Sequence, residues 1–120
     1  MHEFAIGEWL VKTVSSELER IEPVPKLLSV RVVVGRLRQV VPDNIEFAYR
    51  SLAKGTNLEG SILEIVSVPV LAECRKCRQR EEIKDALFQC SACGSGDLEI
   101  LGGKELYLDG LTVSDGDAED

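Results

Sequence analysis

The chain has 120 residues, of which 44% are hydrophobic, so it can form one compact domain and a small additional module but hardly two full cores. Its formal net charge of -7 argues against broad nucleic-acid binding, which requires clustered lysine and arginine to neutralise phosphates. Its apolar runs are too short to span a bilayer, which excludes an integral membrane protein.

The first segment has the periodicity of an amphipathic helix. Apolar residues recur at three- and four-residue steps from Phe4 to about Ile21, and Pro23 and Pro25 end the pattern. From Leu28 to Leu37, apolar and polar residues alternate. The sequence therefore predicts a helix followed by a β-strand.

A second, shorter helix is predicted after Val41-Pro42. Asp43 is the expected N-cap, and Glu46 three residues later completes a pattern like a capping box. Gly55 is the expected left-handed residue at the exit of the helix.

Two further segments have strand character. Residues 62–68 are rich in β-branched side chains, and Pro69 closes this segment. Residues 105–113 resume an apolar pattern, which is easiest to explain if this segment returns to pair with the earlier strands. The stretch between them would then be an insertion between two strands of one sheet. The acidic residues 115–120 have little apolar surface to bury and are expected to be disordered.

Four cysteines lie in the inserted stretch, and the chain has no others. Cys74 and Cys77 form one Cys-x-x-Cys pair, and Cys90 and Cys93 form a second pair after twelve intervening residues. Two such loops can supply four thiolates to one tetrahedral metal ion. Because residues 69–104 contain few large apolar side chains, we expect the metal to hold this stretch together.

Other interpretations of the four cysteines are a disulfide framework, a redox site and an iron site. A disulfide framework suits a secreted chain, but the first residues lack the features of a signal peptide, so we expect a cytoplasmic protein. A thioredoxin-like redox site needs only one Cys-x-x-Cys pair. Iron in a rubredoxin-type site stays open, because four cysteines alone do not distinguish zinc from iron, although spacing and context favour zinc.

His2 is the only histidine, and its position gives it unusual neighbours. The α-amine of Met1, the amide nitrogen of His2 and its imidazole can form fused chelate rings around one ion, and Glu3 can add a fourth donor. Nitrogen-rich, near-planar donor sets suit Ni²⁺ or Cu²⁺ better than Zn²⁺ or Mg²⁺. From this chemistry alone, a solvated histidine on a frayed terminus stays an alternative. No catalytic constellation is visible elsewhere in the chain.

Several segments, taken in order, resemble one family. These segments are Met1-His2-Glu3, residues 32–37, Val41-Pro42 with residues 47–49, Glu59-Gly60 with residues 63–65, the two cysteine pairs, and residues 103–106. Residues 1 to about 113 are similar to the hydrogenase-maturation nickel metallochaperones of the HypA/HybF type. The chain departs from the family where Arg36-Leu37-Arg38-Gln39 replaces a common acidic residue and serine, and it lacks the zinc-domain histidine of some members.

The resemblance implies an α+β fold in which two helices pack on a small three-stranded sheet, with an inserted zinc-ribbon-like four-cysteine domain. Residues 1–68 with 105–114 would form the nickel-binding domain, residues 69–104 the zinc domain, and residues 115–120 the disordered tail. Nickel would bind at His2 with Met1 and Glu3 contributing. Structural zinc would bind Cys74, Cys77, Cys90 and Cys93.

The family resemblance also implies partners and a role. Family members deliver Ni(II) to the large subunit of [NiFe]-hydrogenase alongside a GTPase of the HypB type, some also serve urease maturation, and they are not enzymes. No nucleic-acid or membrane partner is expected. The competing hypothesis is a zinc-ribbon protein-interaction module with no labile metal, in which His2 is incidental.

Overall fold

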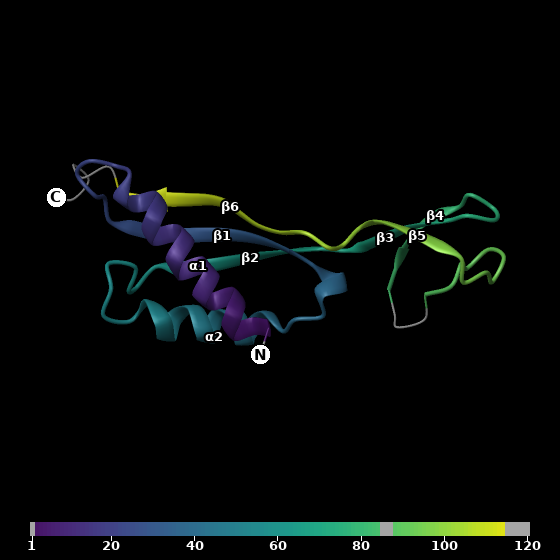
Figure 1. Ribbon diagram of the computed structural model, residues 1–120, viewed down its shortest axis with the longest axis horizontal. Helices are drawn as coiled ribbons and strands as arrows, with labels where there is room; N and C mark the ends of the chain where they lie inside the picture. Colours follow the sequence, from purple (N-terminus) through teal and green to yellow (C-terminus); the bar gives the residue numbers. More distant parts are fainter. Residues whose placement is uncertain (1, 85–87, 115–120) are drawn as a thin grey trace. The chain divides into compact units, whose positions relative to one another are not determined.

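The computed structural model describes residues 2–84 and 88–114. The chain divides into two compact units (Figure 1). Unit 1 comprises Met1–Val32, Val40–Ile65 and Leu108–Asp120, and unit 2 comprises Val33–Gln39 and Val66–Tyr107. Residues 33–39 thus belong to the same unit as the cysteines, although they directly follow residues of unit 1. The tail expected at residues 115–120 lies outside the described part of the chain.

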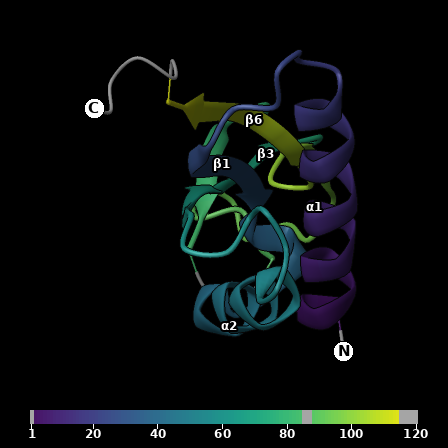
Figure 2. The same cartoon turned by 90° about the vertical axis from the view of Figure 1, so that its left-hand side faces the viewer.

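Two helices and a three-stranded sheet form the first part of the architecture. Helix α1 is His2–Glu19 and helix α2 is Pro42–Ala53. The sheet has the order β2-β1-β6, with β1 at Leu27–Gly35, β2 at Ile62–Val68 and β6 at Leu106–Val113. Figure 2 shows α1 and α2 beside the sheet. The α+β class and the return of the last strand to pair with an earlier one are confirmed.

The core of unit 1 lies between the helices and the sheet. Helix α1 buries one stripe of apolar side chains at three- and four-residue spacing, which is the amphipathic pattern expected from the sequence. Where the helices meet, Gly7 is essential to the spacing, because a Cβ atom there would lie 2.8 Å from the Cβ of Ala48. The fully buried large side chains include Leu10, Val14, Leu18, Val30, Val32, Ile45 and Tyr49.

The start of α2 differs from the prediction. Its N-cap is Val41, which makes no side-chain capping hydrogen bond, and Pro42 occupies the first helical position. Asp43 is therefore inside the first turn, and the predicted capping role for Asp43 with Glu46 is wrong. The physical reason is Pro42, whose fixed φ suits a first turn and whose missing N–H needs no cap. Gly55 has φ 82°, which confirms its left-handed conformation after the helix.

A second small sheet lies in unit 2, and its strands were not predicted from the sequence. Its order is β4-β3-β5, with β3 at Val70–Cys74, β4 at Arg80–Ile83 and β5 at Leu98–Gly102. Strand β3 pairs antiparallel with both neighbours. Val70, Ala72 and Cys74 of this strand are buried. Cys74 is the last residue of β3, and Cys77 lies in the turn between β3 and β4. Cys90 and Cys93 lie between β4 and β5.

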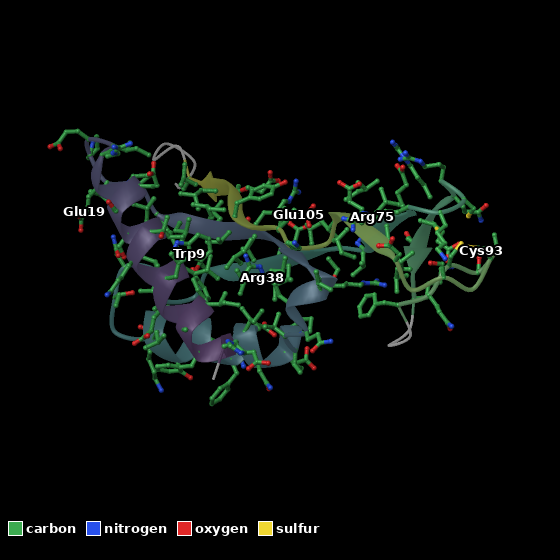
Figure 3. The ribbon with its side chains drawn as sticks, turned by 45° about the vertical axis from the view of Figure 1, so that its right-hand side comes forward. Trp9, Glu19, Arg38, Arg75, Cys93 and Glu105 are labelled. Atoms are coloured by element: carbon green, nitrogen blue, oxygen red, sulfur yellow. The ribbon has the colours of Figure 1, made fainter. Side chains whose placement is uncertain are left out.

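Two backbone segments of unit 2 approach each other closely at a pair of glycines. A Cβ atom at Gly35 would lie 2.0 Å from the carbonyl oxygen of Gly103, so no larger residue fits. The Gly35 N–H donates to the Glu105 carbonyl at 2.7 Å, and the Leu37 N–H donates to the Gly103 carbonyl at 2.8 Å. Arg38, labelled in Figure 3, lies in the 3₁₀ helix η1 at Arg36–Arg38. Its side chain donates to the Lys104 carbonyl at 2.9 Å.

Within the part of the chain that the structure describes, α1 and α2 are each too short or too polar to cross a membrane.

Candidate metal centre

Each cysteine pair lies in a hairpin of the same backbone form. In the first, the Cys74 N–H donates to the Gln79 carbonyl at 2.9 Å, and the Arg78 N–H donates to the Cys74 carbonyl at 2.8 Å. In the second, the Cys90 N–H donates to the Ser95 carbonyl at 2.8 Å, and the Gly94 N–H donates to the Cys90 carbonyl at 2.8 Å. These repeated bonds hold the two sulfurs of each hairpin on the same side.

The residue after the second cysteine of each hairpin has a left-handed backbone. This residue is Arg78 with φ 68° in the first hairpin and Gly94 with φ 79° in the second. Glycine adopts this conformation without strain, whereas arginine does not. The side chain of Arg78 donates to a Glu73 carboxylate oxygen at 3.2 Å, and Arg80 donates to the other oxygen at 2.9 Å. These contacts hold the first hairpin where its backbone is strained. The second hairpin has glycine at the matching position and therefore no such strain.

The four sulfur atoms converge on one point. All four lie within 4.8 Å of one another, and they form the one such cluster among the residues that the structure describes. The Cys74 and Cys93 sulfurs are 3.6 Å apart, and those of Cys77 and Cys90 are 3.5 Å apart. A tetrahedral ion with metal–sulfur bonds of about 2.3 Å requires sulfur–sulfur distances of about 3.8 Å. The geometry therefore fits a tetrahedral ion bound by four thiolates.

The thiols have different affinities for protons. The backbone N–H of Cys77, 3.5 Å from the Cys74 sulfur, is the main reason why the pKa of the Cys74 thiol is lowered to about 7. At Cys77 the backbone N–H of Gln79 acts to lower the pKa, but the neighbouring Cys90 sulfur and desolvation outweigh it and raise the pKa to about 12. Thiols that share one small volume resist joint ionisation. A divalent cation would displace their protons on binding.

The second candidate centre is at the start of α1. His2 is exposed in the first turn, and Glu3 follows it with a half-exposed side chain. One carboxylate oxygen of Glu3 accepts a hydrogen bond from the Val41 N–H at 3.0 Å, and this bond is the main reason why the pKa of Glu3 is lowered. Met1, the third residue of the predicted nickel site, lies outside the described residues. The structure thus brings the four cysteines together and places His2 and Glu3 in one helical turn.

Two contacts between distant residues were not predicted from the sequence. Val41 contacts Glu3, and Gly35 contacts Gly103, yet only the second of these pairs has a sequence signal. That signal is the presence of glycine in both family-like segments, because a glycine often marks a close approach of two backbones. Nothing in the sequence indicates that the backbone N–H of Val41 meets Glu3.

A family model described as "Hydrogenase/urease nickel incorporation, metallochaperone, hypA" matches residues 1–113, which include His2, Glu3 and all four cysteines. The chain belongs to the HypA family. The resemblance stated from the sequence is confirmed, and the family is one of metallochaperones that act in nickel incorporation.

Curated relatives of this HypA family member are similar over nearly their whole length. The hydrogenase maturation factor HypA of Desulfatibacillum aliphaticivorans is 34% identical over 96% of this chain and 88% of its own length. The protein of the same name from Thermococcus onnurineus is 30% identical over 94% of this chain and 96% of its own length. The match extends over both units of the chain rather than over the cysteine region alone.

Two solved structures share the fold. The solution structure of the Ni metallochaperone HypA from Helicobacter pylori has a TM-score of 0.60 at 19% identity, covering 92% of this chain and 96% of that one. A second solution structure of a HypA protein has a TM-score of 0.66 at 22% identity, covering 95% of this chain and 97% of that one. At these identities the likeness shows the fold, namely two helices with small sheets.

Proposed function

We propose that this protein is a nickel metallochaperone that binds Ni(II) at its N-terminus and delivers it to the large subunit during [NiFe]-hydrogenase maturation. The observation that carries the proposal is the family match over residues 1–113, because it includes the Met1-His2-Glu3 start and both cysteine pairs in one chain. A zinc-ribbon module alone would account only for the cysteines.

The start of α1 has suitable chemistry for the nickel site. His2 is exposed, so its imidazole is accessible to an ion from solvent. The first four amides of an α-helix have no carbonyl acceptor within the helix, so ligation by the amides of His2 and Glu3 breaks no helical hydrogen bond. The α-amine of Met1 and the imidazole of His2 complete a set of nitrogen donors that suits square-planar Ni(II).

The four cysteines would hold a structural Zn(II). Two of the sulfurs are buried, and all four ligand positions of a tetrahedral ion would be filled by Cys74, Cys77, Cys90 and Cys93. Such a closed site leaves no position for a substrate, so its bound zinc would stabilise the module rather than be delivered. An exposed N-terminal site, by contrast, allows transfer to a partner. We propose no catalytic role for either site.

The remaining features follow from the same proposal. The nickel-binding domain would be residues 1–68 with 105–114, and the zinc domain residues 69–104. Partners would be a nickel-handling GTPase of the HypB type, the hydrogenase large subunit and, in a urease-containing cell, urease maturation proteins, with neither nucleic acid nor membrane as a partner. The place of action would be the cytoplasm.

A nickel titration tests the site directly. Untagged protein that begins at Met1 should develop an absorption band of square-planar Ni(II) at one equivalent, and His2→Ala should lose this band and bind at least about tenfold more weakly. One residue added before Met1 is the matched variant, because it blocks the α-amine and leaves His2 in place. Equal nickel affinity in the parent and in either variant would refute the N-terminal site, provided that the circular dichroism and zinc content are unchanged.

A further inference from the structure

The two cysteine hairpins of unit 2 are attached to its sheet in different ways. The first, residues 74–79, is the turn between β3 and β4, which pair with each other. The second, residues 90–95, lies just before β5, which pairs with β3. Residues 88 and 89, which precede it, belong to no strand. Within the described chain, strand pairing therefore fixes both ends of the first hairpin but only the C-terminal end of the second.

The side chain of Glu81, in β4, contacts the second hairpin at the residue after its first cysteine. One carboxylate oxygen accepts a hydrogen bond from the Ser91 hydroxyl at 2.6 Å, and the other accepts one from the Ser91 N–H at 3.2 Å. Apart from contacts among the four sulfurs, the other hydrogen bonds of this hairpin in the described chain join residues 89–97 to one another. The Glu81 carboxylate thus holds the side of the hairpin that has no paired strand.

The first hairpin has a matching contact of a different kind. Arg75 occupies the same position in it as Ser91 does in the second hairpin. The Arg75 N–H donates to the main-chain carbonyl of Asp97 at 2.9 Å. The two side chains also form an ion pair at 3.3 Å, but both are more than half exposed, and such pairs contribute little. The first hairpin is therefore held through a carbonyl that any residue provides, and the second through one particular side chain.

We infer that Glu81 is a positioning residue for the cysteine cluster, which holds the second hairpin at Ser91 so that its two sulfurs face those of the first hairpin and the ion is retained. This inference rests on the proposed structural zinc, and it gives Glu81 no contact with the ion. A hairpin that turns freely must be ordered when the metal binds, and that ordering weakens binding. The two hydrogen bonds from Ser91 to one carboxylate oppose this motion.

The experiment uses the full chain, and the probe is Zn(II) in competition with a chelator. Glu81→Ala should weaken Zn(II) binding about tenfold and speed the loss of Zn(II) to the chelator by a similar factor, which is the usual scale for groups that orient metal ligands. Ser91→Ala removes the shorter bond and keeps the N–H, so its effect should be smaller, about threefold. The double variant should bind no more weakly than Glu81→Ala, because both changes remove the same contact.

Two matched variants remove an acidic side chain and leave this contact in place. Glu82→Ala changes the next residue of β4, whose exposed side chain lies on the opposite face of the strand. Asp97→Ala keeps the carbonyl that accepts the Arg75 N–H. Both should bind Zn(II) within about twofold of the parent. Equal affinities of Glu81→Ala and Glu82→Ala would overturn the inference, and so would additive effects of Glu81→Ala and Ser91→Ala.

Two spectroscopic measurements separate positioning from ligation and from a general loss of structure. With Co(II) as a coloured substitute, saturated Glu81→Ala should have the spectrum of the parent, because four thiolates still bind the ion. In the Zn(II)-loaded variant, hydrogen exchange should be faster than in the parent at the Ser91 amide and unchanged at the Gly94 amide, which bonds to the Cys90 carbonyl inside the hairpin. A changed Co(II) spectrum, or equal acceleration at both amides, would contradict the positioning role.

A further pair of variants covers the case in which Glu81→Ala does not fold. Glu81→Gln keeps one acceptor oxygen for Ser91 and should weaken Zn(II) binding about threefold, whereas Glu82→Gln should leave it unchanged. Equal affinities in this pair would overturn the inference. Failure of the proposed function gives a different result, because a parent protein that binds neither Zn(II) nor Co(II) at the cysteines would refute the structural zinc itself.

Discussion

The two candidate centres differ in nearly every physical respect. The cysteine cluster is rich in sulfur, is formed by two hairpins with repeated backbone bonds, and has two buried ligands. The start of α1 offers an exposed His2, and the Glu3 carboxylate beside it accepts a hydrogen bond from the Val41 N–H. A site with many fixed ligands retains its ion, whereas a site on a single turn exchanges it more readily. Under the proposed function, one chain would combine a site that retains its ion with a site that releases it.

Removal of a cysteine should have the largest effect. Cys74→Ala or Cys90→Ala should abolish stoichiometric zinc binding, since apparent binding free energies of structural zinc reach about 10 kcal/mol or more and stabilise the folded module. Residues 69–104 should then become sensitive to protease, while helices α1 and α2 retain their circular dichroism. The readouts are metal analysis and mass spectrometry of the fragments. If either variant kept its full zinc content and stayed resistant to protease, the cysteine cluster would not be a structural metal site, and the contrast with the start of α1 would fail.

The glycine contact at Gly35 should be the next most sensitive position. Gly35→Ala places a Cβ atom 2.0 Å from the Gly103 carbonyl oxygen, so the two backbones must separate. We expect a loss of about 3 kcal/mol in the free energy of unfolding, the size of a severe overpacking effect. Urea denaturation of the zinc-loaded protein measures it.

The matched control for Gly35 is another strand glycine in open space. Gly110 lies in β6, and a Cβ atom there would meet no heavy atom within 4 Å. Gly110→Ala should change the unfolding free energy by no more than about 0.5 kcal/mol. Equal effects of the two substitutions would mean that the close approach of Gly35 and Gly103 is unimportant for stability.

The smallest expected effect is a pH dependence at Glu3. Its pKa is lowered in the folded protein, chiefly by the Val41 N–H, so Glu3 contributes stability above the unfolded-state pKa and loses it as the pH falls through the folded-state pKa. When the two proteins are compared in the same buffers, the urea midpoint of the parent should fall slightly more between pH 5 and pH 3 than that of Glu3→Gln, which does not titrate. Parallel midpoints in the two proteins would show that the Val41 bond does not favour the ionised carboxylate.

The sequence alone determined the class of the cysteine site and the main elements. Two Cys-x-x-Cys pairs are short-range patterns, and a short loop is enough to bring its two sulfurs together. The periodicities of α1 and β1 are likewise local, so both elements were predicted to within two residues at most boundaries. Even the local prediction failed at Asp43, because the preceding Pro42 begins the helix without a side-chain cap.

Only the tertiary structure decided which distant residues meet. The bond from Val41 to Glu3 and the contact of Gly35 with Gly103 join residues that are 38 and 68 positions apart (41 minus 3, and 103 minus 35). The glycine pair leaves a sequence signal, because only glycine fits there, but the Val41 bond is donated by a backbone N–H, which every residue type except proline carries. A donor common to nearly all residues leaves no trace in the sequence, so the bond from Val41 to the first turn of α1 becomes visible only when the chain is folded.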